Sequence, residues 1–171
     1  TQWVIDHRSD MNIALVDHLG DIVENSGNAT EWARADQHLR TLDQNDIAVG
    51  IAPGNHDLTS SGVATMYDSI VPPARYQSYD WYGGYLGATG DSIDDGGRDR
   101  MWKDNYVLFS AGGMDFINVG IEFGWPQYSI DWARAVLDAY PNRRAIISTH
   151  RFLDDGNQLS AAQTLRNDEI S

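Results

Sequence analysis

One short apolar run in this chain ends in a tight turn that is followed by three polar side chains. Residues 47–51 read Ile-Ala-Val-Gly-Ile, Pro53-Gly54 forms the turn, and Asn55-His56-Asp57 comes next. A short apolar run bounded by Pro-Gly is typical of a buried strand. Ligands bind at the carboxyl ends of strands in open α/β sheets. The amide, imidazole and carboxylate are therefore predicted to lie at a strand tip.

Two other apolar runs end in a similar way. Residues 13–16 lead into Gly20-Asp21, and residues 145–147 lead into His150. Taken singly, Gly-Asp is more often a turn, and one histidine is more often a satisfied group near a core. Taken together, three strands would deliver an Asp, an Asn-His-Asp group and a His to one sheet edge. Their joint placement favours a binding site over three unrelated turns.

A helix is predicted between the first two strands. Asn28 is a suitable N-cap, and four apolar residues follow at spacings of three and four on one helix face: Trp32, Ala35, Leu39 and Leu42. Strand, helix and strand from Ile13 to Ile51 then form one βαβ unit with a right-handed crossover. This unit puts Asp21 and Asn55 at the same edge of the sheet.

The remaining pattern predicts further α/β structure. Residues 2–8 resemble the end of a helix, and residues 106–109 and 116–121 form a hairpin around Ala111-Gly112-Gly113-Met114. A helix is expected over residues 130–140, a strand over 145–148, and a last helix from Ser160 to about Arg166. An antiparallel pair inside a βαβ chain implies a mixed sheet or two sheets. We expect one α/β domain over residues 1–171.

The segment from Leu58 to Lys103 lacks a clear periodicity. It holds Tyr and Trp residues among glycines, then an acidic stretch at residues 91–99. The acidic stretch fails the calcium-loop template at its third position and at the final Glu, so it is interpreted as a solvated loop. Two interpretations of the aromatic residues are open. They would line a cleft or stack on sugars, or they would pack this loop onto the domain. Packing is the favoured interpretation.

Composition limits the partners. The net charge is −13 with 12 basic residues, which disfavours nucleic acid as the main partner because such binding needs Lys and Arg to neutralise phosphates. No apolar run approaches the roughly 20 residues of a membrane span, so no membrane partner is expected. The chain has no cysteine, which excludes thiolate chemistry. Cellular location stays open, although this acidic, aromatic-rich composition would suit an exported or extracellular bacterial protein.

The three strand-end groups suit metal chemistry. Asp, Asn and His are ligands for hard or borderline divalent ions. A two-metal centre needs a bridging carboxylate and leaves a hydroxide to attack phosphorus in line. Asp21 is the natural bridge, with Asn55 and His150 on one of the two ions. His56, held by Asp57, would donate a proton to the leaving oxygen.

These residues resemble three motifs of the calcineurin-like metallophosphoesterase superfamily, and the resemblance spans Ile13 to His150. It rests on Gly20-Asp21, on Gly54-Asn55-His56-Asp57, and on His150 after an apolar strand. It implies a sandwich of two mixed β-sheets flanked by helices, two divalent metal ions, and hydrolysis of phosphomonoesters or phosphodiesters. It also implies that Asp21 bridges the metals, Asn55 and His150 bind the second metal, and His56 contacts phosphate while Asp57 orients it. The residues do not distinguish between Mn, Fe, Zn and Ni as the bound metal.

Two motifs of that superfamily have no counterpart here. The opening D-x-H or D-x-Q and the closing G-H-x-H are both missing, which suggests a fold that is incomplete at both termini. We therefore expect the 171 residues alone to bind at most one metal weakly and to be nearly inactive. An absent first strand would leave a sheet edge unpaired, so self-association is also expected.

Two other functions compete with this one. A carbohydrate-binding or glycosidase domain would use the Tyr/Trp segment and a pair among 25 carboxylates. A non-catalytic domain would keep the fold without a complete metal site. Metal-dependent hydrolysis of a small phosphorylated substrate would distinguish a metallophosphoesterase from both of these alternatives.

Overall fold

The structure is a computed structural model that describes residues 1–59, 64–87 and 102–153. Within these residues it is a mixed α/β fold with two sheets and four α-helices. The smaller sheet pairs two parallel strands, β1 (Val16–His18) and β2 (Val49–Ile51). The larger sheet has the order β3-β4-β5-β6, with β3 (Tyr82–Tyr85), β4 (Asn105–Ala111), β5 (Met114–Ile121) and β6 (Arg144–Thr149). The helices are α1 (Gln2–Met11), α2 (Ala29–Asp43), α3 (Thr65–Ile70) and α4 (Gln127–Ala139), and a short 3₁₀ helix spans Pro73–Arg75.

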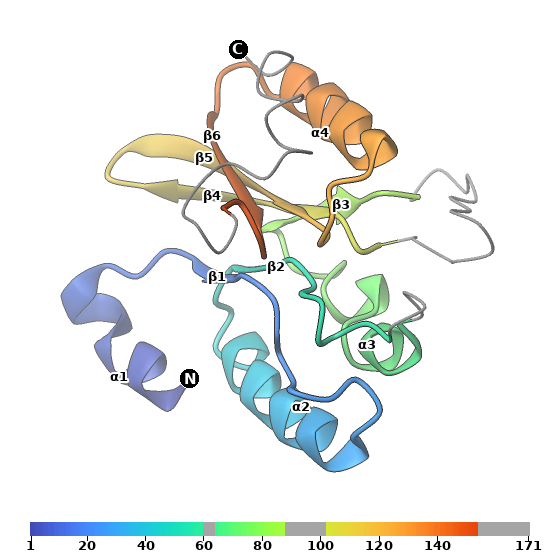
Figure 1. Ribbon diagram of the computed structural model, residues 1–171. Coiled ribbons are helices and arrows are strands. Elements are labelled where there is room, and N and C mark those ends of the chain that lie inside the picture. The colour runs from blue at the N-terminus through green and yellow to red at the C-terminus, as the bar shows by residue number, and fades with distance from the viewer. Residues whose placement is uncertain (60–63, 88–101, 154–171) are drawn as a thin grey trace.

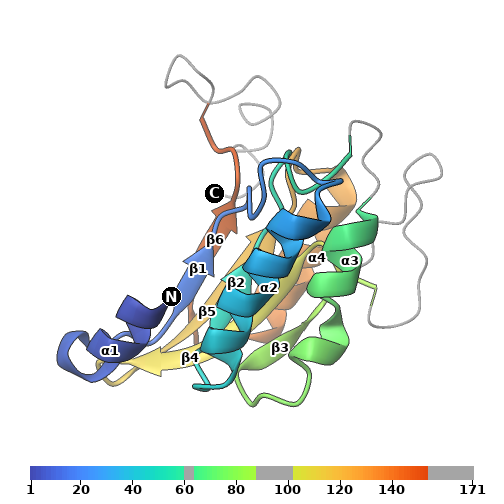
Figure 2. The same cartoon turned by 90° about the horizontal axis from the view of Figure 1, so that it is seen from below.

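The two sheets lie between helices. In Figure 1, α4 covers the outer side of the larger sheet, while α2 and α3 lie beyond the smaller one. The view from below in Figure 2 shows the same order of layers. One apolar core gathers between α2, α3 and the smaller sheet, and a second lies between β5 and α4. The class predicted from the sequence, α/β with two sheets, is confirmed at this level.

The predicted helix after Asn28 is confirmed as α2. The Asn28 side chain accepts hydrogen bonds from the backbone N–H groups of Thr30 and Glu31, as an N-cap should. Trp32, Leu39 and Leu42 are buried, so the predicted apolar face is the one that packs. The helix joins β1 to β2, which pair in parallel. The βαβ unit is therefore present with its two strands adjacent.

The first strand lies two to three residues later than predicted. Residues 13–16 were expected to form it, but β1 begins at Val16 and ends at His18. The reason is the exit from α1: Asn12 takes a left-handed conformation with φ 54°, and the N–H of Ile13 still bonds to the carbonyl of Arg8. Residues 13–15 are used to leave the helix, so pairing with β2 starts only at Val16.

The predicted hairpin is confirmed as β4 and β5, which pair antiparallel around two glycines at φ +58° and +76°. The predicted helix over residues 130–140 is confirmed as α4, and the strand over residues 145–148 as β6. β6 is the last strand in the order of its sheet, and Ile146 and Ile147 are each 38% exposed. Self-association through a sheet edge stays a prediction.

The aromatic segment packs inward, as favoured from the sequence. Tyr76 and Trp81 are buried in the first core, and Trp81 contacts Tyr79 with ring centroids 5.0 Å apart. The acidic stretch at residues 91–99 and the helix expected from Ser160 lie outside the described residues. No helix in the described part of the chain has the length and apolar character needed to cross a bilayer.

Candidate metal centre

The three predicted metal ligands come together at the carboxyl ends of their strands. Asp21 follows β1, Asn55 follows β2, and His150 directly follows β6. The Nε2 atom of His150 lies 3.3 Å from Asp21 Oδ2 and 3.1 Å from Asn55 Oδ1. The tips of β1 and β6 lie side by side in Figure 2, although they belong to different sheets. The structure thus brings all three side chains to one point.

Two glycines let the loops after β1 and β2 touch. A Cβ on Gly20 would lie 2.4 Å from the backbone N of Gly54, and a Cβ on Gly54 would lie 2.3 Å from Asp21 Oδ1. Gly20 also has φ +92°, a conformation that L side chains rarely adopt. Asp21 itself has φ 51°, which is uncommon for a non-glycine residue and occurs at functional sites. The Gly-Asp and Gly-Asn pairs are therefore steric requirements of this junction.

His150 is held in the orientation that metal-binding histidines adopt. Its Nδ1–H donates to the backbone carbonyl of Leu19 at 2.8 Å, because a carbonyl oxygen can only accept. Nδ1 therefore carries a proton, and Nε2 is the ring nitrogen that faces Asp21 and Asn55 and would bind a metal ion. A ligating histidine usually donates its other ring N–H to a carbonyl or carboxylate in this way.

The donor atoms also suit one cation by their spacing. Metal–nitrogen and metal–oxygen bonds of about 2.0–2.2 Å put neighbouring ligands of one ion roughly 3 Å apart. The distances from His150 Nε2 to the two oxygens, 3.3 and 3.1 Å, match that value. Within the described residues, no three His, Cys, Asp or Glu side chains gather as a metal-binding group. The cluster contains two such side chains and completes its donor set with an amide oxygen.

His56 lies beside this cluster with its ring anchored at one nitrogen. Its backbone N–H donates to Asp21 Oδ1 at 3.0 Å, and its Nδ1–H donates to the carbonyl of Glu24 at 2.7 Å. The Glu24 carbonyl and then the Asp21 carboxylate favour the imidazolium, which raises the pKa of His56 above its ordinary value. Nε2 is left as the ring nitrogen that can act on a substrate.

Asp57 has a different role from the one predicted. It was expected to orient His56, but its carboxylate accepts instead from the backbone N–H groups of Ile22, Val23 and Gly54, at 2.7, 3.2 and 2.8 Å. The side chain is 1% exposed and lies beneath the site. Burial raises the pKa of Asp57, and the three N–H donors oppose that rise. Asp57 therefore ties the loop after β1 to the turn after β2, and the Glu24 carbonyl orients His56.

His18, the last residue of β1, contacts the loop that follows this strand. Its Nδ1 accepts a hydrogen bond from the N–H of Gly20 at 3.3 Å. Burial lowers the pKa of His18, and the nearby carboxylates of Asp57, Asp17 and Asp21 offset this only in part. A neutral ring is needed for the bond, since Nδ1 must carry a lone pair. His18 thus supports the turn that presents Asp21.

A buried polar cluster joins the two sheets beneath the site. Asp17 Oδ2 accepts from the Ser148 hydroxyl and from Asn118 Nδ2, the latter at 3.1 Å. Asn118 Nδ2 also donates to Ser148 Oγ at 2.8 Å. Asp17 is on β1 and Ser148 is on β6, so these bonds connect the strands that carry Asp21 and His150. The relative position of Asp21 and His150 depends on this connection, because β1 and β6 share no backbone ladder.

Sequence reasoning missed three participants at the site. The carbonyls of Leu19 and Glu24 orient the two histidines, and the ring of Phe123 lies 5.9 Å from that of His150. Backbone carbonyls carry no residue signature, so no pattern could have shown the first two. Phe123 follows the carboxyl end of β5, and this position after a strand is the sequence feature that could have placed it at the site.

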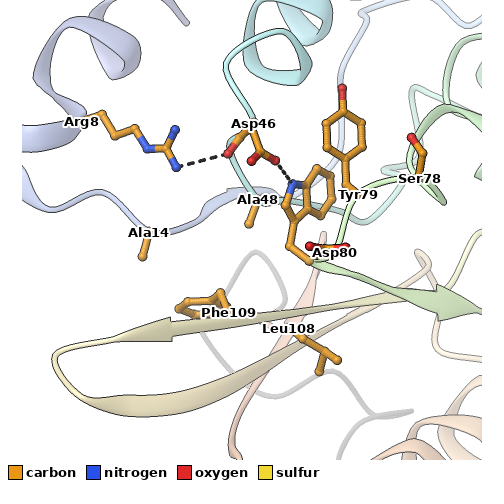
Figure 3. A pocket seen from close by; sticks show the side chains of 10 residues that line it. Arg8, Ala14, Asp46, Ala48, Ser78, Tyr79, Asp80, Leu108 and Phe109 are labelled. Carbon is orange, nitrogen blue, oxygen red and sulfur yellow. Dashed lines mark hydrogen bonds between the residues drawn. The ribbon is translucent and has the colours of Figure 1, made fainter.

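A separate cleft lies at the opposite ends of the parallel strands. It has a volume of about 560 Å³, and Ala14 and Ala48, which precede β1 and β2, face Leu108 and Phe109 of β4 across it. Figure 3 shows Arg8 at its rim bonded to the carbonyl of Asp46. The nitrogen Nε1 of Trp81, also in the lining, donates to Asp46 Oδ1 at 3.0 Å. None of the predicted site residues lines this cleft.

Comparison with known proteins finds one strong sequence match. The chain is 31% identical over 157 residues to a Bacillus subtilis (strain 168) protein named "Uncharacterized protein YvnB". The match covers 90% of this chain but 11% of that protein, so the chain spans about a tenth of the relative's length. No family model and no solved structure matches the chain.

Proposed function

We propose that this domain hydrolyses phosphate esters with the help of divalent metal ions, as a calcineurin-like metallophosphoesterase would. The observation that carries the proposal is the convergence of Asp21, Asn55 and His150, with His150 Nε2 3.3 and 3.1 Å from the two oxygens. The arrangement of helices outside two sheets (Figure 1) supports the layered sandwich that this superfamily implies, although of the two described sheets only the larger is mixed and the smaller is parallel. The proposal covers phosphomonoesters and phosphodiesters alike.

The proposed chemistry divides between the ions and the protein. Asp21, Asn55 and His150 would hold divalent metal. When bound, the ions supply a hydroxide nucleophile and offset the charge that develops on the phosphoryl oxygens. His56 would donate a proton from Nε2 to the leaving oxygen. Its ring is held for this by the Glu24 carbonyl, and its raised pKa favours the protonated form.

The competing carbohydrate-binding function receives less support. Sugar-stacking sites need exposed aromatic faces, whereas Tyr76 is 3% and Trp81 is 9% exposed. Trp81 and Tyr79 do line the separate cleft, but none of the candidate metal-site residues does. A non-catalytic domain would have no use for a histidine whose tautomer leaves Nε2 facing a carboxylate and an amide oxygen. We therefore keep metal-dependent hydrolysis as the proposed function.

The test, made on the full-length protein, is hydrolysis of 4-nitrophenyl phosphate and bis(4-nitrophenyl) phosphate with and without Mn²⁺ or Zn²⁺. We expect metal-dependent release of nitrophenol from at least one ester. His150→Ala should lower the rate by about 100-fold or more, because loss of even a supporting group at a metal site costs 10- to 100-fold. His38→Ala, which changes an exposed histidine on α2, is the matched control. Equal rates with and without metal, or no loss in His150→Ala, would contradict the proposal.

A further inference from the structure

A carboxylate on α2 holds the loop that presents Asp21. Glu31, in the first turn of the helix, accepts hydrogen bonds at Oε2 from the backbone N–H groups of Glu24 and Asn25, both at 2.9 Å. Its other oxygen, Oε1, accepts from Asn28 Nδ2 at 2.5 Å. An ionised carboxylate can only accept, and here three donors occupy its two oxygens. Glu31 is therefore fixed relative to both the helix and the loop.

One peptide unit of this loop, between Glu24 and Asn25, is bound on both sides by side chains. Its N–H belongs to Asn25 and donates to Glu31 Oε2. Its C=O belongs to Glu24 and accepts from His56 Nδ1–H at 2.7 Å. A trans peptide is planar, so its N–H and C=O point in opposite directions and turn together. The Glu31 carboxylate thereby determines where the carbonyl that holds the imidazole points.

The charge of Glu31 strengthens this connection. Hydrogen bonds to an ionised acceptor are roughly twice as strong as neutral ones, and hydrogen bonds in a chain polarise one another. The carboxylate attracts the peptide N–H, which increases the negative charge on the Glu24 carbonyl oxygen and favours a proton on His56 Nδ1. The carboxylate of Glu24 itself is less suited, because its Oε1 lies 3.7 Å from Nδ1 and the side chain is 87% exposed.

We propose that Glu31 acts through this peptide unit as a positioning residue for His56. It keeps the proton on Nδ1 and so leaves Nε2 as the nitrogen that serves the leaving oxygen. This inference rests on the proposed function, in which His56 is the proton donor. In Ser-His-Asp enzymes a carboxylate bonded directly to the catalytic histidine selects the tautomer in the same way. In this chain a peptide unit lies between the two groups.

The kinetic test uses the metal-loaded full-length protein and two substrates, the phenyl and 4-nitrophenyl esters of phosphate. Phenoxide is a more basic leaving group than 4-nitrophenoxide and therefore depends more on the proton from His56. Glu31→Ala should lower the turnover number on the phenyl ester by about tenfold or more, a part of the full effect of a general acid, and on the 4-nitrophenyl ester by less. Glu31→Gln keeps an oxygen for the two N–H groups, so it should retain more activity than Glu31→Ala.

Two controls separate positioning from a general effect on the fold. Asp138→Asn, which also neutralises an exposed carboxylate but on α4, should leave both rates unchanged. Combining Glu31→Ala with His56→Ala should slow the reaction no further than His56→Ala alone, because positioning acts only through the imidazole. Equal losses on the two esters in Glu31→Ala, or additive losses in the double variant, would overturn the inference.

NMR of isotopically labelled histidine nitrogens tests the same connection without activity. The His56 signals, identified by their absence from His56→Ala and recorded with the ring neutral, should show the Nδ1–H tautomer in the wild type. They should shift toward the Nε2–H tautomer in Glu31→Ala, and an unchanged tautomer would overturn the inference even if esters are hydrolysed. A tautomer that depends on Glu31, in a protein that hydrolyses no phosphate ester, would refute the proposed function and leave the connection between Glu31 and His56 standing.

Discussion

At the scale of single residues, the two histidines of the site differ in what surrounds them. Each donates Nδ1–H to a backbone carbonyl, His150 to Leu19 and His56 to Glu24. His150 Nε2 faces Asn55 and Asp21, whereas the His56 side chain is 39% exposed beside the cluster. This difference is the reason for proposing that His150 binds metal and that His56 contacts the substrate. The residue types were predictable from the sequence, but the carbonyls that orient them were not.

We predict that, in the full-length protein, His56→Ala lowers the turnover number on phosphate esters by about 10²- to 10⁴-fold, the range typical of a lost general acid or base. Bound metal, measured by elemental analysis, should hardly change because His56 is not a ligand. A variant that loses its metal along with its activity would show that His56 has been given the wrong role.

Gly54→Ala tests the contact between the two loops. The new methyl group would lie 2.3 Å from Asp21 Oδ1 and 2.4 Å from the Asp21 backbone N, so the loop that carries Asp21 must shift. We expect metal affinity in a calorimetric titration to fall by about tenfold or more, as it does when a ligand loses its orientation. Gly27→Ala is the control, because its methyl group would meet its nearest neighbour at 3.5 Å. Unchanged affinity in Gly54→Ala would contradict this view of the junction.

At the scale of elements, periodic segments were predictable and strand boundaries were not. The sequence predicts α2 and α4 because apolar residues recur at helical spacing in both segments, and Pro141-Asn142 predicts where α4 ends. β1 was placed too early because the apolar run of residues 13–16 carries no signal for the left-handed exit from α1. Strand pairing decides where β1 begins, and pairing depends on a partner that is distant in sequence. His18, a polar residue inside β1, could not be assigned from pattern alone.

The protonation of His18, on strand β1, should make the stability of the fold depend on pH. Burial lowers its pKa in the folded state, so the unfolded chain binds a proton more readily. The contribution of the neutral ring to stability is present above the unfolded pKa of about 6.5 and is lost as pH falls through the folded pKa. We expect the urea midpoint of the wild type to drop between pH 8 and pH 5, and His18→Asn to show a smaller drop. Identical decreases of the urea midpoint in the wild type and in His18→Asn would show that His18 does not cause the pH dependence.

At the scale of the whole molecule, the site depends on two sheets being held together. Asp17, Asn118 and Ser148 make that link from β1, β5 and β6. No sequence pattern connects residues 17, 118 and 148, because a contact between sheets reflects packing and not local periodicity. The strand-end motifs predicted where the ligands converge, but not how that position is maintained.

Removing the link should destabilise the fold. Asp17→Ala removes the acceptor of the Ser148 hydroxyl and one of the two acceptors of Asn118 Nδ2, which should cost about 1–3 kcal/mol in the free energy of unfolding. Asp17→Asn should lower the free energy of unfolding by less than Asp17→Ala does. Its amide nitrogen can replace Asp17 Oδ1 and donate to Asn118 Oδ1, two buried atoms that have no hydrogen-bond partner among the described residues. Urea unfolding measures both variants, with Asp115→Ala on the exposed hairpin as the control. Equal losses for Asp17→Ala and Asp17→Asn would argue against this pairing.

The central claim is that Asp21, Asn55 and His150 bind a divalent metal ion. Calorimetric titration of Mn²⁺ into the protein, compared with titration into Asp21→Asn and into the exposed-site control Asp10→Asn, tests it most directly. The account predicts one saturable ion held by the three side chains, with affinity reduced at least about tenfold in Asp21→Asn and unchanged in Asp10→Asn. Absence of saturable binding in the wild type, or equal affinity in the wild type and Asp21→Asn, would contradict it.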